Sequence, residues 1–176
     1  MKKIIILSLS MFFFMSGCNA NDTNQDEEKY NLYENYKNQL ISNSGMLSYN
    51  IPFQYKMDVT RLEDGTYSYT IVIDKPEIIM NHVKVMAINM NKDNDNYMIA
   101  NVGILDDHTY SLVPNQVDQA KGYPKGIALN DISLTADFRV SVIVSFLKDS
   151  HTSKDTNIFF NFDVVNGEVV SEVNNE

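Results

Sequence analysis

The chain has 176 residues, with 23 acidic against 14 basic side chains and a formal net charge of −9. This length suffices for one domain with its own hydrophobic core. Nucleic-acid phosphates attract clusters of Lys and Arg, so the acidic balance argues against a nucleic-acid partner. The same balance argues against purely electrostatic binding to anionic lipids.

The N-terminus carries the pattern of a secretory signal peptide. Lys2 and Lys3 precede an apolar run over residues 4–15, which is too short to span a bilayer as a permanent helix. Small residues then lead into Cys18, the single cysteine of the chain. The stretch Met15-Ser16-Gly17-Cys18 resembles the lipobox of bacterial lipoproteins, with Met at a position where that family prefers Leu.

This resemblance implies a location and an anchor. Residues 1–17 would be removed as a lipoprotein signal peptide, and Cys18 would carry diacylglycerol and, as in lipoproteins generally, palmitate-type acylation. The protein would then sit on the outer face of the bacterial cell membrane, with the lipid as its membrane contact. A lipidated Cys18 leaves no thiol for a disulfide. The alternative is an ordinary secreted protein with one unmodified cysteine.

The first part of the mature chain is expected to be a tether and a helix. Residues 18–28 are polar and acidic, which favours a flexible tether. Over residues 29–45, Tyr33, Tyr36 and Leu40 recur at three- and four-residue spacing, as on one face of an amphipathic helix. Such a tyrosine stripe either binds a partner or packs on its own domain, and both interpretations stay open.

Residues 46–168 change to a period of two, which is typical of β-strands. The most distinct strands are a hairpin around Asp64-Gly65 and the closing runs 138–146 and 158–164, in which apolar residues alternate with polar ones. Seven or eight such strands predict a mainly β fold, an immunoglobulin-like antiparallel β-sandwich preceded by one α-helix. Residues 169–176 are expected to form a disordered tail.

No constellation of catalytic residues occurs in the sequence, and we expect neither an enzyme nor a bound cofactor. The three histidines stand far apart, and no metal-ligand, nucleophile-elbow or phosphate-loop motif is present. Asn91, Asp93 and Asp95 offer alternate oxygens to Ca²⁺, although the Gly and Glu positions of an EF-hand are not filled. Asx residues also serve in turns for backbone reasons alone, so a calcium site at Asn91–Asp95 stays an open alternative.

A long loop over residues 114–126 is the other candidate surface. Loops of this length in a sandwich often carry function, and Tyr123-Pro124-Lys125 presents an aromatic ring and a cation on a stiff turn. Tyr33, Tyr36, Tyr123 and Lys125 are therefore the candidate partner-binding residues. The alternative for Tyr123 is that its ring closes one end of the sandwich.

Residues 50–165 resemble small lipoproteins of low-GC Gram-positive bacteria with an immunoglobulin-like domain of undefined function. The resemblance is carried by the Asp-Gly hairpin, residues 103–107 and residues 121–127. Some lipoproteins of this general kind act in envelope interactions, and by that analogy we expect a membrane-anchored binding module for an envelope or cell-surface partner. The alternative function is a lipoprotein that binds a soluble ligand such as a sugar, a peptide or Ca²⁺.

Overall fold

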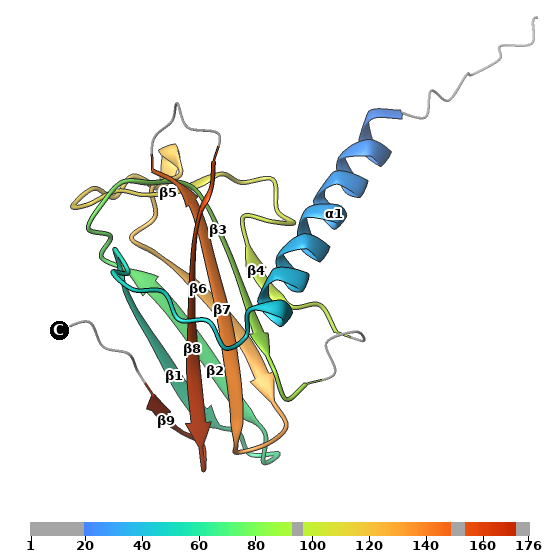
Figure 1. Ribbon diagram of the computed structural model, residues 1–176, viewed down its shortest axis with the longest axis vertical. Coiled ribbons are helices and arrows are strands. Elements are labelled where there is room, and N and C mark those ends of the chain that lie inside the picture. The colour runs from blue at the N-terminus through green and yellow to red at the C-terminus, as the bar shows by residue number, and fades with distance from the viewer. Residues whose placement is uncertain (1–19, 93–96, 149–153, 172–176) are drawn as a thin grey trace, which may run out of the picture.

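A computed structural model describes residues 20–92, 97–148 and 154–171, without the side chains of residues 20–24 and 171. In these ranges one long α-helix precedes nine β-strands, which form two antiparallel sheets (Figure 1). The prediction of a mainly β sandwich preceded by one helix is confirmed, with nine strands where seven or eight were expected. The immunoglobulin-like topology stays a prediction.

The smaller sheet has three strands in the order β1-β2-β6, namely β1 (Gln54–Arg61), β2 (Tyr67–Asp74) and β6 (Gly126–Ser133). The expected hairpin joins β1 to β2. Gly65 takes a φ of +86°, and the Thr66 N–H donates to Asp64 Oδ1 across 2.9 Å. An Asp side chain and a glycine with positive φ are what a tight hairpin turn requires.

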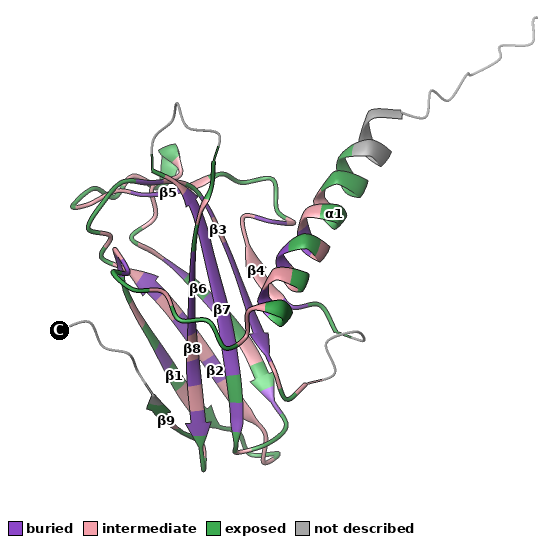
Figure 2. Ribbon diagram, viewed as in Figure 1, coloured by how far each residue is buried: buried purple, intermediate pink, exposed green. Residues whose placement is uncertain are grey.

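The larger sheet has six strands. Its order is β4 (Ala100–Val102), β3 (Met80–Asn89), β7 (Phe138–Leu147), β8 (Thr156–Val165) and β9 (Glu168–Ser171), while β5 (Tyr110–Leu112) pairs with the start of β3. A single 3₁₀ turn, η1 (Gln119–Lys121), lies in the loop between β5 and β6. The strands β3, β7 and β8 form the buried centre of the sheet (Figure 2).

The main core fills the space between the two sheets. Alternate side chains of each strand point into it because successive residues of a strand face opposite sides. Each fully buried aliphatic or aromatic side chain stabilises the fold by about 1.5–3 kcal/mol. The inward-facing residues include Ile71, Ile73, Val140, Val142, Phe160 and Phe162.

The helix α1 (Ala20–Ser42) adds a third layer on the outer face of the larger sheet. Tyr33, Tyr36 and Leu40 pack against residues of β3, β7 and β8 in a second apolar cluster, which includes Met86, Ile88, Ile143 and Phe159. This cover explains why the central part of β7 is buried on both faces. In Figure 1 the N-terminal part of α1 projects beyond the sandwich.

The bounds of α1 correct two predictions. Residues 20–28, expected as part of a flexible tether, are helical, and the helix ends at Ser42 where residue 45 was expected. Glu27, Glu28 and Lys29 are residue types with high helix propensity, so the charged composition that we interpreted as a tether is compatible with a helix.

The C-terminal prediction is corrected in the same way. Residues 169–171, expected in a disordered tail, belong to β9, which pairs with β8. Asn166 and Gly167 have φ values of +54° and +80°, as a two-residue hairpin turn requires. The Asn-Gly dipeptide was the sequence signal for this hairpin.

Candidate binding site

A cavity of about 390 Å³ opens where β3 and β6 end, at one end of the sandwich. We call it the β3–β6 pocket. It is lined by Asn89, Asn91, Lys92, Tyr97, Ser133, Leu134 and Thr135. The lining thus combines amide, ammonium and hydroxyl groups with one aromatic and one aliphatic side chain.

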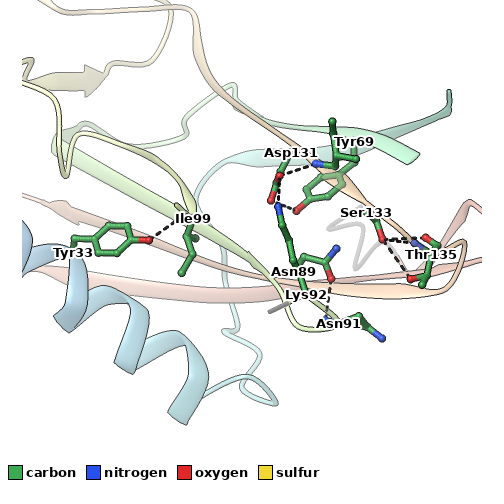
Figure 3. Close-up of polar contacts among 10 residues, drawn as sticks. Tyr33, Tyr69, Asn89, Asn91, Lys92, Ile99, Asp131, Ser133 and Thr135 are labelled. Carbon is green, nitrogen blue, oxygen red and sulfur yellow. Dashed lines mark hydrogen bonds and ion pairs between the residues drawn. The ribbon is translucent and has the colours of Figure 1, made fainter. Parts of the chain in front are cut away.

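A charged pair lies at the polar side of this pocket (Figure 3). The Lys92 ammonium donates to Asp131 Oδ1 across 2.9 Å, and the two side chains are only 17% and 20% exposed. The Ile132 N–H also donates to Oδ1, and the Tyr69 hydroxyl donates to Oδ2 across 3.3 Å. Burial, followed by the nearby Asp131 charge, raises the pKa of Tyr69, so its hydroxyl remains a donor. Both oxygens of Asp131 are therefore engaged.

Hydrogen bonds within the chain fix the other pocket walls. Asn89 is buried, and its Oδ1 accepts from the Asn91 N–H across 2.9 Å. Asn91 Oδ1 in turn accepts from the Arg139 N–H across 3.0 Å, which ties the loop after β3 to the start of β7. On the opposite wall, the Ser133 hydroxyl donates to the Thr135 carbonyl oxygen. The contacts of Asn89 and Ser133 join residues two positions apart, and such short-range Asx and Ser hydrogen bonds commonly fix the shape of loops.

Exposed apolar side chains lie at the pocket. Tyr97 and Leu134 line it, and Met98 follows Tyr97 in the chain. Tyr97, Met98 and Leu134, which we call the rim, are 57%, 75% and 75% exposed. The Lys92 ammonium lies 4.8 Å from the centre of the Tyr97 ring, a cation–π distance that holds this ring beside the pocket. Large apolar side chains grouped around a polar site mark a binding surface.

No protein-family model, curated protein or solved structure matches the chain. The pocket, its rim and the position of both on the fold are therefore the features that bear on function.

The strand ends that carry the pocket and the N-terminal end of α1 lie at different ends of the sandwich. In Figure 1, β3 and β6 run toward the lower end of the sandwich, whereas the first turns of α1 project from its upper right. Among the helical residues that the structure describes, none form a segment with the length and apolar composition of a membrane span.

Two of the predicted partner-binding residues are not on the surface. Tyr33 and Tyr36 are only 7% and 4% exposed, because both rings lie between α1 and the larger sheet. The Tyr33 hydroxyl oxygen also accepts the Ile99 N–H across 2.9 Å (Figure 3). The prediction that these two tyrosines bind a partner is wrong, and the alternative, packing on their own domain, is confirmed.

The other two predicted residues lie in the loop before β6. Tyr123 is half-buried, and its backbone pairs with Asp118. Lys125 is exposed and lines a second, shallower cavity of about 310 Å³. The remaining lining residues of that cavity are Asp74, Lys75, Pro76, Val113, Asn115, Gln116 and Val117. The structure does not bring Tyr123 or Lys125 together with Tyr33 and Tyr36.

Two further predictions fall on parts of the chain that the structure does not describe. Cys18 lies before the first described residue, and Asp93 and Asp95 of the candidate calcium turn lie in the gap at 93–96. Asn91, the first residue of that turn, uses its side-chain oxygen on the Arg139 N–H. Among the described residues, no group of three His, Cys, Asp or Glu side chains could hold a metal ion.

Sequence reasoning missed the β3–β6 pocket itself. The turn beginning at Asn89 was considered for calcium, but the facing segment Ser133-Leu134-Thr135 lies 44 positions or more further along the chain. The one local signal was Tyr97-Met98, two large apolar residues directly after a polar turn. The shared pocket lining and the hydrogen bond between Lys92 and Asp131 show that these segments meet.

Proposed function

We propose that this chain is a lipid-anchored extracytoplasmic lipoprotein that binds an envelope or cell-surface partner through the β3–β6 pocket and its rim. The anchor rests on the lipobox-like stretch Met15-Ser16-Gly17-Cys18. The binding role rests on the pocket, the one observation that carries it. A half-buried charged pair beside three exposed apolar side chains gives the polar and apolar contacts that protein interfaces combine.

The arrangement of the fold supports this combination of anchor and pocket. Cys18 stands two positions before Ala20, where α1 begins, so a lipid on Cys18 would be attached close to the projecting end of the helix. The part of α1 before Tyr33 spans 13 residues, or about 20 Å at 1.5 Å per residue. With Cys18 at the membrane, this helix holds the sandwich away from the lipid and leaves the pocket facing outward.

The anchor is tested by membrane fractionation of the full-length protein and its Cys18→Ala variant. We expect the wild type to stay in the membrane fraction after carbonate washing and to incorporate labelled palmitate. The variant should lose the label and move to the soluble fraction. Ser8→Ala, a change within the apolar run, serves as the matched control and should behave as the wild type. A variant that stays in the washed membrane would overturn the anchor.

The binding role is tested by crosslinking in living cells, followed by mass spectrometry of the captured proteins. We expect one dominant envelope or surface partner, whose recovery falls with Leu134→Ser. The matched control is Val170→Ser on β9, which also removes an exposed aliphatic side chain but lies outside the pocket. Equal recovery from both variants would show that the rim is not the binding surface.

A soluble ligand is the second candidate function. The β3–β6 pocket has a volume at the lower end of the range of small-molecule sites, which is about 300–1,000 Å³. Under this alternative, purified protein binds a sugar or peptide in the pocket, and crosslinking recovers no specific protein.

A further inference from the structure

We infer that the β3–β6 pocket recognises a peptide segment of the partner. In this mode one apolar side chain of the segment lies between Tyr97 and Leu134, and its neighbouring carbonyl oxygens accept hydrogen bonds from Lys92. The inference rests on the proposed function and names the chemical class of the partner group. Three properties of the described residues carry it: an excess of hydrogen-bond donors, an apolar rim, and the position of Lys92 over the Tyr97 ring.

The pocket offers donors more than acceptors. An ammonium group has three N–H donors, and the Asp131 carboxylate takes one from Lys92. Asn91 uses its side-chain oxygen on the Arg139 N–H, and its amide NH₂ group has no hydrogen-bond partner in the described part of the chain. A ligand that complements this lining must bring acceptor oxygens.

The required acceptors are neutral. Asp131 balances the charge of Lys92, and the pair is mostly withdrawn from water. A free anion would therefore meet a site with little net charge, on a chain that carries −9 overall. Backbone carbonyl oxygens are neutral acceptors, and every residue of a peptide supplies one.

The rim requires an apolar group from the same ligand. Tyr97, Met98 and Leu134 leave aromatic, thioether and aliphatic surface in water beside these donors. Tyrosine and methionine are enriched at protein interfaces, and an apolar anchor that fills a small pocket gives much of the binding free energy there. A peptide with an apolar side chain meets both requirements within one or two residues.

Two other occupants fit less well. Saccharides stack on flat aromatic faces, but Lys92 lies over the Tyr97 ring, and the chain contains no Trp. A second copy of this chain would bring another net charge of −9 to the interface, and the two copies would repel. The peptide is therefore the occupant that the lining and the rim favour together.

The test uses the full chain, ¹⁵N-labelled and held in detergent micelles, with three probes. The probes are a blocked tripeptide with a central leucine, the same tripeptide with a central serine, and chitotriose. We expect the leucine peptide to shift the amide resonances of Asn89, Tyr97 and Leu134 with a dissociation constant of about 1 mM. The serine peptide should bind about tenfold more weakly, because it lacks the apolar group.

Variants then separate the pocket from the rest of the surface. Leu134→Ser and Lys92→Met should each weaken binding of the leucine peptide about tenfold. Leu134 is largely exposed, so its variant keeps the fold and remains informative if Lys92→Met unfolds. Val170→Ser is the matched control and should bind as the wild type does.

The inference fails if chitotriose shifts these amides and the peptides do not. It also fails if the two peptides bind equally well, or if no probe moves the pocket resonances. Should Leu134→Ser still abolish partner capture in cells, the proposed function would stand and only the peptide class would be lost. A different pair of results would overturn the proposed function. In that case the purified protein binds the leucine peptide, but Leu134→Ser does not change the capture of the partner in cells.

Discussion

The Lys92 ammonium donates to Asp131 Oδ1 across 2.9 Å, and this contact joins the two sheets at the pocket. Lys92 follows β3 of the larger sheet, whereas Asp131 belongs to β6 of the smaller one. Because each side chain is about one-fifth exposed, solvent screens the pair less than a surface ion pair. The pair therefore fixes the distance between the pocket walls.

Asp131→Asn should lower the free energy of unfolding by about 1–3 kcal/mol. The substitution leaves the Lys92 charge partly buried without its partner, although the new amide oxygen can still accept from Tyr69 or Ile132. Urea denaturation followed by circular dichroism measures the loss. Asp58→Asn is the matched control, because it breaks the exposed Lys56–Asp58 pair and should cost less than about 1 kcal/mol. Equal losses would show that burial adds nothing to the Lys92–Asp131 pair.

The sandwich and the leading helix were predictable because their signals are local. The alternation of apolar residues over 69–73 corresponds to the buried positions of β2. In β7 the apolar residues of the alternating pattern are buried, but residues 141, 143 and 145 between them are buried as well. Asp64-Gly65 identified the first hairpin, since few other dipeptides accept its backbone geometry. In each case the signal for the element lies in a few adjacent residues of the sequence.

The candidate site could not be predicted in this way. Its two walls, near Asn89 and near Ser133, come from different sheets and meet only through the tertiary fold. Tyr33 and Tyr36 were misassigned for the opposite reason: helical periodicity identifies an apolar face but not what covers it. Without α1, the apolar outer face of the larger sheet would be exposed to water. The apolar side of α1 packs against that face.

The Tyr33 hydroxyl should contribute to the docking of α1. It is the acceptor for the buried Ile99 N–H, and Tyr33→Phe leaves that donor unsatisfied at a cost of about 1–3 kcal/mol. Hydrogen–deuterium exchange should show faster exchange of the Ile99 amide and of the α1 amides. Tyr30→Phe, which changes a largely exposed ring one turn earlier, should leave both rates unchanged. Unaltered exchange at Ile99 in the Tyr33→Phe variant would contradict the role of this hydrogen bond.

Gly103 should tolerate no side chain. Its φ is +74°, and a Cβ atom there would lie 2.4 Å from the Val83 carbonyl oxygen, so the backbone of β3 would have to move. We expect Gly103→Ala to lower the free energy of unfolding by about 2–4 kcal/mol. In Gly45→Ala the new methyl group meets no atom within 4 Å, and the change should stay within about 0.5 kcal/mol. Thermal denaturation of the two variants measures both losses. A larger loss for Gly103→Ala than for Gly45→Ala shows that the steric contact, and not the mere replacement of a glycine, causes the destabilisation.

Tyr36 should make the stability of the protein depend on alkaline pH. Burial raises the pKa of its hydroxyl from the ordinary value of 10 to about 12, while the hydrogen bond with Ser145 opposes this shift. The unfolded chain therefore loses this proton near pH 10 and the folded chain near pH 12. The resulting stability is fully present below pH 10 and is lost as the pH rises toward 12, by about 2–3 kcal/mol in total.

Urea denaturation at a series of pH values across this window measures the effect. Tyr36→Phe should remove that part of the fall in stability. The variant keeps the fall that Tyr69 causes, because burial raises the pKa of Tyr69 as well and its proton is also lost first from the unfolded chain. Tyr49→Phe is the control, because that side chain is almost fully exposed and its loss should leave the pH profile as in the wild type. If Tyr36→Phe and Tyr49→Phe gave the same profile, the Tyr36 hydroxyl would have to be in contact with water, and α1 would not cover the sheet as tightly as its buried apolar cluster requires.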